Sequence, residues 1–428
     1  MTDYLGILVS WFYTGDMAQA SSDTRRALIV GAGISGLAAA SALSKAGWQP
    51  VVVERAAQRR RGGYFIAMFG CGRTAANRIG LQGIRNRVPD RAHTYLVDRA
   101  GNRRPGLGFQ DVPNGPWMML RGDVERSAFE ALPDEVAIRF STTPTALTQD
   151  GEGVAVTLLN TQTGESAVER FDLVVGADGI RSTVRQLVWG PHENYLNRLG
   201  FMICAFELPE SLPGLKQQEG AIFSEPGRSF WVFPFADHAP TVLFSYHADD
   251  VDAERARAKQ VGVAQRLRQV YGPEPLGDLM GAAIEHLENT DEFLFDSVEQ
   301  VTVDHWHHGC VVLLGDAAWC PTLYSGMGAT SGLAGADALG LALAKHPDDL
   351  ETALSKWEDT LRPAIADFQK SAYPMRELFT QTSPKEQRKQ TFTIALRRFM
   401  FKLPPLMKLM MRSKSFRLRN GDLAADFA

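Results

Sequence analysis

The first strong pattern along the chain is an apolar run, a glycine-rich turn and a second apolar run. Residues 26–30 are mostly apolar, glycines stand at 31, 33 and 36, an Ala- and Leu-rich stretch reaches Lys45, and a second apolar run ends at Val53. An apolar run ending in glycines predicts a buried strand, and the alanine-rich stretch predicts a helix packed closely on it. The pattern therefore predicts a βαβ unit of about 30 residues.

Later segments alternate between strand and helix periods. The stretch from Phe201 to His247 is rich in aromatic and β-branched residues broken by Pro and Gly, which is typical of an antiparallel sheet. No segment repeats at a solenoid period. The patterns predict strands over 136–140, 154–159, 173–176 and 311–314, and helices over 121–131, 252–270, 276–286, 331–345 and 350–368.

The glycine turn has the spacing of a dinucleotide-binding fingerprint. Gly31 suits the tight turn, Gly33 lets the backbone approach a pyrophosphate, and Gly36 allows close helix packing. The following helix directs its N–H groups and positive dipole end at the phosphates. Glu54, eighteen positions after Gly36, is placed to accept ribose hydroxyls and disfavours a 2′-phosphate. FAD or NAD is therefore preferred over NADP here, and the predicted site includes Ser35 and Arg55.

Two further clusters of glycine and aspartate follow predicted strands, and either alone is often a plain turn. In this order after the first fingerprint, the three motifs resemble the single-component FAD-dependent monooxygenases of the para-hydroxybenzoate hydroxylase type. The resemblance extends from about Ala27 to about Phe368. The first cluster is Asp178-Gly179, and the second is Gly315-Asp316 followed by Gly326, Gly328 and Ala329.

The resemblance implies an α/β fold. It consists of a doubly wound, Rossmann-like FAD-binding domain, an inserted substrate domain with an antiparallel sheet, and a C-terminal helix. We expect the FAD-binding domain at 24–190 and 298–385, the substrate domain at 191–297 and a basic helical tail at 386–428.

The resemblance also implies roles for matching residues. Gly31, Gly33, Gly36 and Glu54 would bind the ADP half of FAD. Arg121 would contact the pyrophosphate or the ribityl chain. Asp316 would bind the ribityl hydroxyls. Asp178 would belong to a motif linked to FAD and NAD(P)H. Independently of the family, the small residues from Gly326 to Ala329 allow a helix start to approach a planar ring and to stabilise an anionic reduced flavin.

The implied activity is hydroxylation of an aromatic or polycyclic small molecule, in secondary metabolism or drug inactivation. NAD(P)H would reduce FAD, and the reduced flavin would react with O2 to give a C4a-hydroperoxide that transfers one oxygen atom. Two alternatives stay open: a reductase or dehydrogenase of the same fold without oxygen transfer, and a noncatalytic FAD-containing docking protein. The sequence assigns no catalytic acid or base and does not distinguish NADH from NADPH.

The aromatic stripe of residues 230–235 is either core or a wall for a flat substrate. Strand alternation places Trp231, Phe233 and Phe235 on one face, and these are the candidate substrate residues. The histidine run 305–308 cannot direct all its rings at one ion, so we expect no metal site. Three further histidines could face a substrate cavity: His93, His238 and His247.

Composition narrows the class of protein. The 428 residues carry a formal net charge of −4, which gives no reason to expect nucleic acid as a partner. Four scattered cysteines indicate a reduced, cytoplasmic protein, and no apolar stretch is long enough to span a membrane. The apolar run near the N-terminus lacks the features of a secretory signal, and residues 1–16 are left out of the fold prediction as an extension.

The C-terminal tail differs from the rest of the chain in charge. From Lys385 to Asn420 eleven basic residues face one acidic residue, Glu386. We expect this tail to pack against the FAD-binding domain. A contact with an anionic membrane surface or with a partner protein is the alternative.

Overall fold

Parallel strands form the sheet that carries the glycine turn. The computed structural model describes residues 24–59, 63–112, 115–400 and 403–428, so the predicted N-terminal extension lies outside it. Strand β1 is central and almost fully apolar, as expected for a parallel strand covered on both faces. The six-stranded sheet has the order β17 (His307–His308), β18 (Val311–Leu313), β11 (Leu173–Gly176), β1 (Arg26–Val30), β2 (Gln49–Val53) and β7 (Ala137–Arg139), with β17 alone antiparallel.

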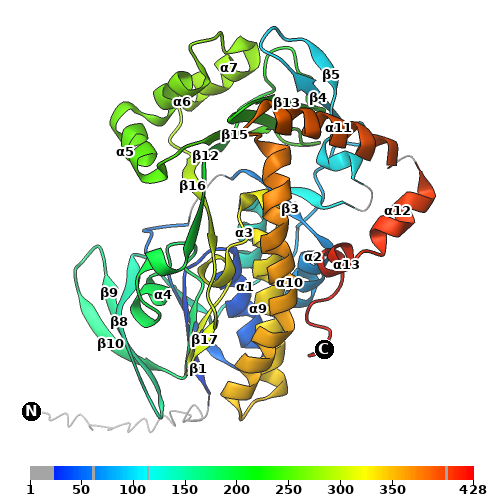
Figure 1. Ribbon diagram of the computed structural model, residues 1–428. Helices are drawn as coiled ribbons and strands as arrows, with labels where there is room; N and C mark the ends of the chain where they lie inside the picture. The colour runs from blue at the N-terminus through cyan, green and yellow to red at the C-terminus, as the bar shows by residue number, and fades with distance from the viewer. Residues whose placement is uncertain (1–23, 60–62, 113–114, 401–402) are drawn as a thin grey trace, which may run out of the picture.

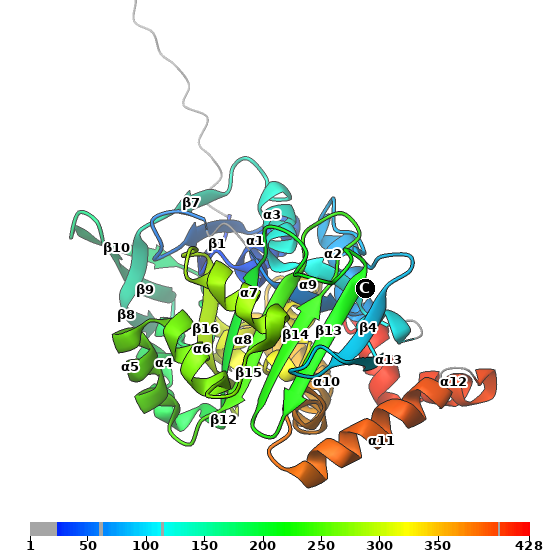
Figure 2. The same ribbon diagram turned by 90° about the horizontal axis from the view of Figure 1, so that it is seen from above.

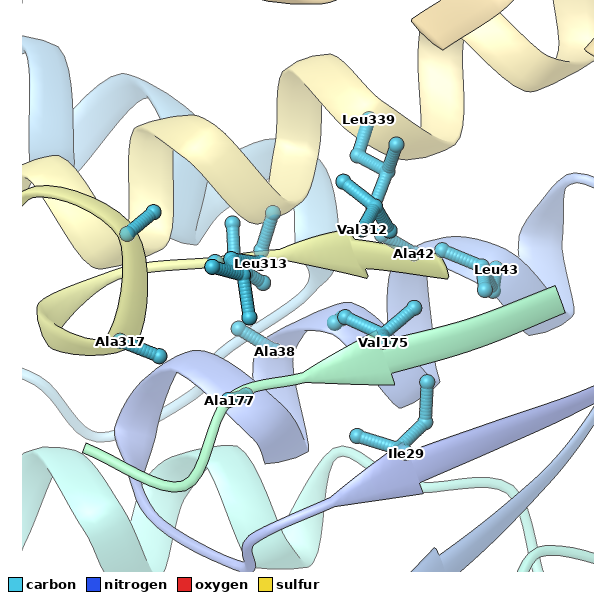
Figure 3. Packing of buried hydrophobic residues seen from close by; sticks show 14 of the residues in the cluster. Ile29, Ala38, Ala42, Leu43, Val175, Ala177, Val312, Leu313, Ala317 and Leu339 are labelled. Carbon is cyan, nitrogen blue, oxygen red and sulfur yellow. The ribbon is translucent and has the colours of Figure 1, made fainter. Parts of the chain in front are cut away.

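Helices α1 (Ile34–Lys45) and α9 (Gly328–Lys345) pack on each other and on this sheet. Figure 3 shows part of this core, with Leu339 of α9 next to Val312 of β18, and Ala38 and Ala42 of α1 among the strand residues. A side chain at Gly340 would lie 2.8 Å from the carbonyl oxygen of Ala42, so small residues permit this close packing. Helices α2 (Gly70–Ile79) and α10 (Leu350–Phe379) pack against α9.

A second, seven-stranded sheet lies above the first in Figure 1. One face packs on helices α5 (Val251–Val261), α6 (Val263–Tyr271) and α7 (Gly277–Leu287), and the other face turns toward β6 and the C-terminal end of α10. The strand order is β16 (Phe293–Val301), β12 (Leu196–Glu207), β15 (Thr241–His247), β14 (Arg228–Phe233), β13 (Glu219–Glu225), β4 (His93–Val97) and β5 (Arg103–Pro105).

The predicted division into segments stays a proposal. Strands β4 and β5 come from the first segment assigned to the FAD-binding domain, yet they pair within the seven-stranded sheet. Strand β16 crosses the expected boundary at 297 and extends to Val301. Two smaller sheets complete the strands: a two-stranded sheet of β3 (Phe65–Met68) and β6 (Trp117–Leu120), and a three-stranded meander of β8 (Thr142–Asp150), β9 (Gly153–Asn160) and β10 (Ser166–Phe171). The remaining elements are α3 (Arg121–Glu130), α4 (Thr183–Val188), α8 (Asp316–Trp319), and the 3₁₀ turns η1 (Phe109–Asp111), η2 (His192–Asn194) and η3 (Leu323–Ser325).

Three helices differ from their predicted bounds. The helix predicted over 252–270 is two helices, because Gly262 between them adopts a left-handed φ of +88°. Helix α9 begins at Gly328 instead of residue 331. Helix α10 continues past its predicted end at residue 368 to Phe379, through Pro363 and Pro374, because its buried face packs on the core along the whole length.

The C-terminal tail has two parts. Helix α11 (Pro384–Met400) packs against β13 and α10 and, with α12 (Pro404–Met411), runs along the edge of the molecule in Figure 2, whereas α13 (Lys414–Asn420) returns to pack on α2. Beyond α13, Ala424 and Phe427 are buried in the core around the parallel sheet. The end of the tail therefore packs on α2 and on the core around the parallel sheet. Among the described helices, none has the length and apolar character to cross a bilayer.

Candidate active site

The glycine turn after β1 combines close packing with open space. Gly31 has a φ of +105°, and a Cβ there would lie 2.6 Å from the carbonyl oxygen of Ala177. A Cβ at Gly36 would lie 1.9 Å from the carbonyl oxygen of Gly31, whereas one at Gly33 would meet no atom within 4 Å. The first and third glycines are thus required by packing, and the middle one borders the space a pyrophosphate would fill.

Glu54 ties this turn to the end of β2. Its Oε2 accepts a 2.9 Å hydrogen bond from the backbone N–H of Ala32, and its Oε1 accepts one of 2.9 Å from Ala56. A carboxylate has further lone pairs, so both oxygens can still accept ribose hydroxyls. Glu54 lies in a cavity of about 190 Å³ whose walls include Arg55, Arg121 and Asp178.

Asp178 closes the opposite wall of this cavity. Its Oδ2 accepts hydrogen bonds from the backbone N–H groups of Thr183 (2.6 Å) and Val184 (3.1 Å) at the start of α4. Its Oδ1 is buried and has no hydrogen-bond partner among the described residues. Burial raises the pKa of this carboxyl. An orphaned buried oxygen beside a cavity indicates that a ligand with hydroxyl or N–H donors belongs there.

Arg121 stands where the small cavity meets a larger one. It begins α3, and its backbone N–H donates a 3.0 Å hydrogen bond to the carbonyl of Tyr64. Arg121 lines both the small cavity and a second cavity of about 440 Å³, as do Gly33 and Gly179. The two cavities therefore form one elongated site with a cation at its middle, which suits a dinucleotide with a central pyrophosphate.

The larger cavity is bounded by the turns around α8 and α9. Asp316 begins α8 directly after Gly315, and burial raises the pKa of its carboxyl. A Cβ at Gly328 would lie 3.7 Å from Oδ1 of Asp316, so this carboxylate and the start of α9 are close neighbours. Ser35 packs against Gly315, where a Cβ would lie 2.5 Å from its Oγ. The predicted residues Gly326, Gly328 and Ala329 also line this cavity.

Aromatic rings line the other end of the larger cavity. The rings of Phe65 and Phe233 stack with centroids 4.2 Å apart and planes at 11°, and Phe109 lies 5.0 Å from Phe65. Tyr324 and Phe379 complete this wall. These rings contact one another and form an aromatic wall, and the part of the cavity in front of it, called the slot below, suits a flat, mainly apolar molecule.

The three predicted substrate residues belong to one buried cluster but occupy different positions, and Phe235 lies beyond the end of β14. Phe233 lines the cavity. Trp231 lies behind it, stacked on Phe379 at 4.4 Å. Phe235 is 0% exposed and does not line the cavity. None of the histidines 93, 238 and 247 lines it either, and His238 pairs with Glu207 at 3.2 Å.

Among the lining residues of the larger cavity that sequence patterns did not identify, five have a part in the proposals below. Tyr324 could have been found, because it lies two positions before Gly326 in the same loop. The others come from distant segments whose local patterns give no functional signal: Phe65, Phe109, Phe379 and Arg419.

The residues present fit FAD. Open space at Gly33, the unpartnered Oδ1 of Asp178 and the acid pair Glu54 and Asp316 at opposite ends match a group with a pyrophosphate between two polyols. Within the described residues no group of three or more potential ligands could hold a metal ion.

Comparison with known proteins agrees with this geometry. A family model described as an FAD-binding domain matches residues 118–353, and one described as an NAD(P)-binding Rossmann-like domain matches residues 29–63. The first covers more than half of the chain.

Relatives and solved structures cover most of the chain. An FAD-dependent monooxygenase of Sarocladium schorii is 27% identical in an alignment that covers 75% of this chain and 76% of the relative. A monooxygenase of Cercospora beticola is 29% identical in an alignment that covers 78% of this chain and 82% of the relative. The crystal structure of tetracycline destructase Tet(51) superposes with a TM-score of 0.68 at 25% identity, covering 89% of this chain and 99% of its own. The chain belongs to the FAD-binding domain family of the para-hydroxybenzoate hydroxylase type, and it is a flavin-dependent monooxygenase that uses FAD and NAD(P)H.

Proposed function

We propose that this monooxygenase inserts one oxygen atom into an aromatic or polycyclic small molecule bound in the slot, against the aromatic wall that includes Phe65, Phe233 and Phe379. The observation that carries the proposal is the position of this aromatic slot in the same cavity as Asp316 and the start of α9. Tetracycline destructase Tet(51), whose name gives a tetracycline as its target, supports a substrate with fused rings.

Each part of the site has a task in this proposal. Acceptance of hydride from NAD(P)H and activation of O2 are the chemistry that FAD supplies when bound. The chain binds that group, orients the substrate and excludes water. The residues proposed to hold FAD are Gly31, Gly33, Ser35, Gly36, Glu54, Arg55, Arg121, Asp178, Asp316, Gly326, Gly328 and Ala329.

The start of α9 and the aromatic walls have complementary roles. The positive end of α9, 18 residues long, stabilises negative charge near Gly328 by about 0.3 to 1 kcal/mol. The aromatic wall holds a flat substrate in one plane and keeps water out of the slot, which limits side reactions with water.

We place the protein in the cytoplasm, since its four cysteines are free thiols.

Ligand-dependent NAD(P)H oxidation tests this function. We expect a panel of fused-ring aromatics to include a compound that accelerates NAD(P)H oxidation by the FAD-loaded chain and yields a product one oxygen atom heavier by mass spectrometry. Full-rate turnover without oxygen on another acceptor would support a reductase instead. FAD that NAD(P)H cannot reduce with any ligand would support a noncatalytic docking protein.

A further inference from the structure

Arg419 of α13 brings a guanidinium to the larger cavity near the Gly326 turn, since a Cβ at Gly326 would lie 3.8 Å from the ring of its stacking partner Phe69. It lines this cavity together with Phe69, Phe109 and Phe379. Its Cζ lies 5.3 Å from the centroid of the Phe69 ring. A guanidinium that stacks on a ring by its face keeps the N–H groups along its edge for an acceptor in its own plane. The stacked position therefore leaves Arg419 able to hold a ligand oxygen.

The charge of Arg419 is not balanced by an ion pair in the described part of the chain. Asp367 is the carboxylate whose charge acts on it, but Asp367 accepts a 2.8 Å hydrogen bond from Ser415 and lies beyond ion-pair distance. Burial lowers the pKa of Arg419, as expected where desolvation is not offset by a carboxylate partner. A partly buried cation of this kind gains free energy when an anion binds beside it.

Two other arginines near the site already have partners or roles: Arg181, which lines the small cavity, and Arg121, which lines both cavities. Arg181 makes a bidentate pair with Asp296, at 2.8 and 2.9 Å. Arg121 lies where the two cavities meet and is proposed to hold the FAD pyrophosphate. Arg419 lines only the larger cavity, the one that contains the substrate slot, so neither assignment covers it.

The fold fixes Arg419 in place from both sides. Asn420 next to it accepts a 3.2 Å hydrogen bond on Oδ1 from the backbone N–H of Gly70. A Cβ at Gly70 would lie 2.7 Å from the Cα of Asn420, so α13 and α2 are in close contact. After the helix, the Nζ of Lys345 donates a 2.6 Å hydrogen bond to the carbonyl of Asp426. A cation held this way loses little conformational entropy on binding a ligand.

We propose that Arg419 binds an anionic oxygen of the substrate, so that the substrates are acidic aromatic or polycyclic molecules with a carboxylate or an ionised enol. This inference rests on the proposed function, because it names the substrate class for the same slot. The aromatic walls bind the ring system whatever its orientation. The guanidinium selects the acid and fixes which end of the molecule lies next to the Gly326 turn.

A matched pair of probes tests the anion site by equilibrium dialysis against the FAD-loaded full chain. The probes are anthraquinone-2-carboxylate and the neutral anthraquinone-2-carboxamide, which share the ring system and differ in charge. We expect the wild-type chain to bind the acid about tenfold more tightly than the amide, the difference expected for a charge-assisted hydrogen bond. Arg419→Gln should remove this preference and leave the Kd of the amide within about twofold.

Two further variants separate position from charge. Arg417 is exposed on the same helix, so Arg417→Gln removes an equal charge without reaching the cavity and should keep the wild-type preference. Arg419→Lys keeps the charge but loses the planar fork, and we expect it to retain part of the preference.

Several results would overturn the inference. They are an equal Kd for acid and amide in the wild type, absence of binding of the acid at about 5 mM, or an unchanged preference in Arg419→Gln. A shift of the ligand-free flavin reduction potential in Arg419→Gln, with the acid preference intact, would assign the guanidinium to the flavin instead. Dialysis needs no turnover, so a chain that prefers the acid but never inserts oxygen would disprove the proposed function and leave the anion site standing.

Discussion

The backbone N–H of Ala32 donates a 2.9 Å hydrogen bond to Oε2 of Glu54. One carboxylate therefore holds the glycine turn and faces the position expected for a ribose. Glu54→Ala should leave the N–H groups of Ala32 and Ala56 without an acceptor and remove the ribose contact. We expect the Kd for FAD to rise about 100-fold, measured by quenching of flavin fluorescence. Glu152→Ala, in the exposed turn between β8 and β9, is the control, and normal FAD affinity in Glu54→Ala would contradict the assignment.

Gly33 and Gly36 should fail in different ways when replaced by alanine. A Cβ at Gly33 meets no atom of the protein, so Gly33→Ala should fold normally and lose FAD affinity because the methyl group enters the pyrophosphate space. A Cβ at Gly36 would lie 1.9 Å from the carbonyl oxygen of Gly31, so Gly36→Ala should lower the free energy of unfolding by about 3 kcal/mol. Thermal unfolding and FAD titration of both variants separate the effects. Equal behaviour of the two variants would contradict this division of roles.

Phe233, the last residue of β14, and Phe235, two positions beyond it, form a matched pair in one buried apolar cluster. Both are almost fully buried, so alanine at either position should lower the free energy of unfolding by about 3 to 5 kcal/mol. Phe233 lines the cavity and stacks on Phe65, so Phe233→Ala should also weaken binding of a flat ligand. Phe235→Ala should leave ligand affinity unchanged in the folded fraction. Loss of ligand affinity in both variants would place the slot elsewhere.

Glu358 makes stability depend on pH. Burial opposes its ionisation, but hydrogen bonds from His307 (2.9 Å), Arg362 and the backbone N–H of Trp306 (2.8 Å) outweigh burial and lower its pKa to about 2. The folded-state pKa lies below the unfolded value of about 4.3, so the ionised group stabilises the fold above that value. This contribution is lost as the pH falls toward about 2. Urea unfolding between pH 6 and about pH 3 should show a smaller pH dependence for Glu358→Gln than for the wild type, and parallel curves would contradict the assignment.

Local patterns predicted the parts of the fold that local interactions determine. The strand over 173–176 and the βαβ unit are found with almost the expected bounds, because apolar period and glycine spacing are properties of neighbouring residues. The length of α10 was not predictable in this way. Pro363 and Pro374 each remove a backbone hydrogen bond of the helix. Burial of Phe368, Ala372 and Phe379 against residues distant in sequence offsets this lost stability.

The residues of the candidate site also fall into those that local patterns locate and those that only tertiary contacts decide. The three glycine and aspartate motifs could be located from sequence, since each is a short strand-to-helix turn with a required geometry. Alternation placed Trp231, Phe233 and Phe235 on one face, but only contacts with Phe65 and Phe379 decide that Phe233 reaches the cavity. Arg419 approaches Phe69 from the far end of the chain, and no pattern around residue 419 indicates such a contact.

Isotope labelling tests the central claim most directly. The FAD-loaded chain, NAD(P)H and an accelerating ligand are mixed under ¹⁸O2 in ordinary water, and the product is analysed by mass spectrometry. A flavin-dependent monooxygenase predicts a product that gains one ¹⁸O atom from the gas and none from water. A product without ¹⁸O, formed at the same rate when oxygen is removed, would contradict the account.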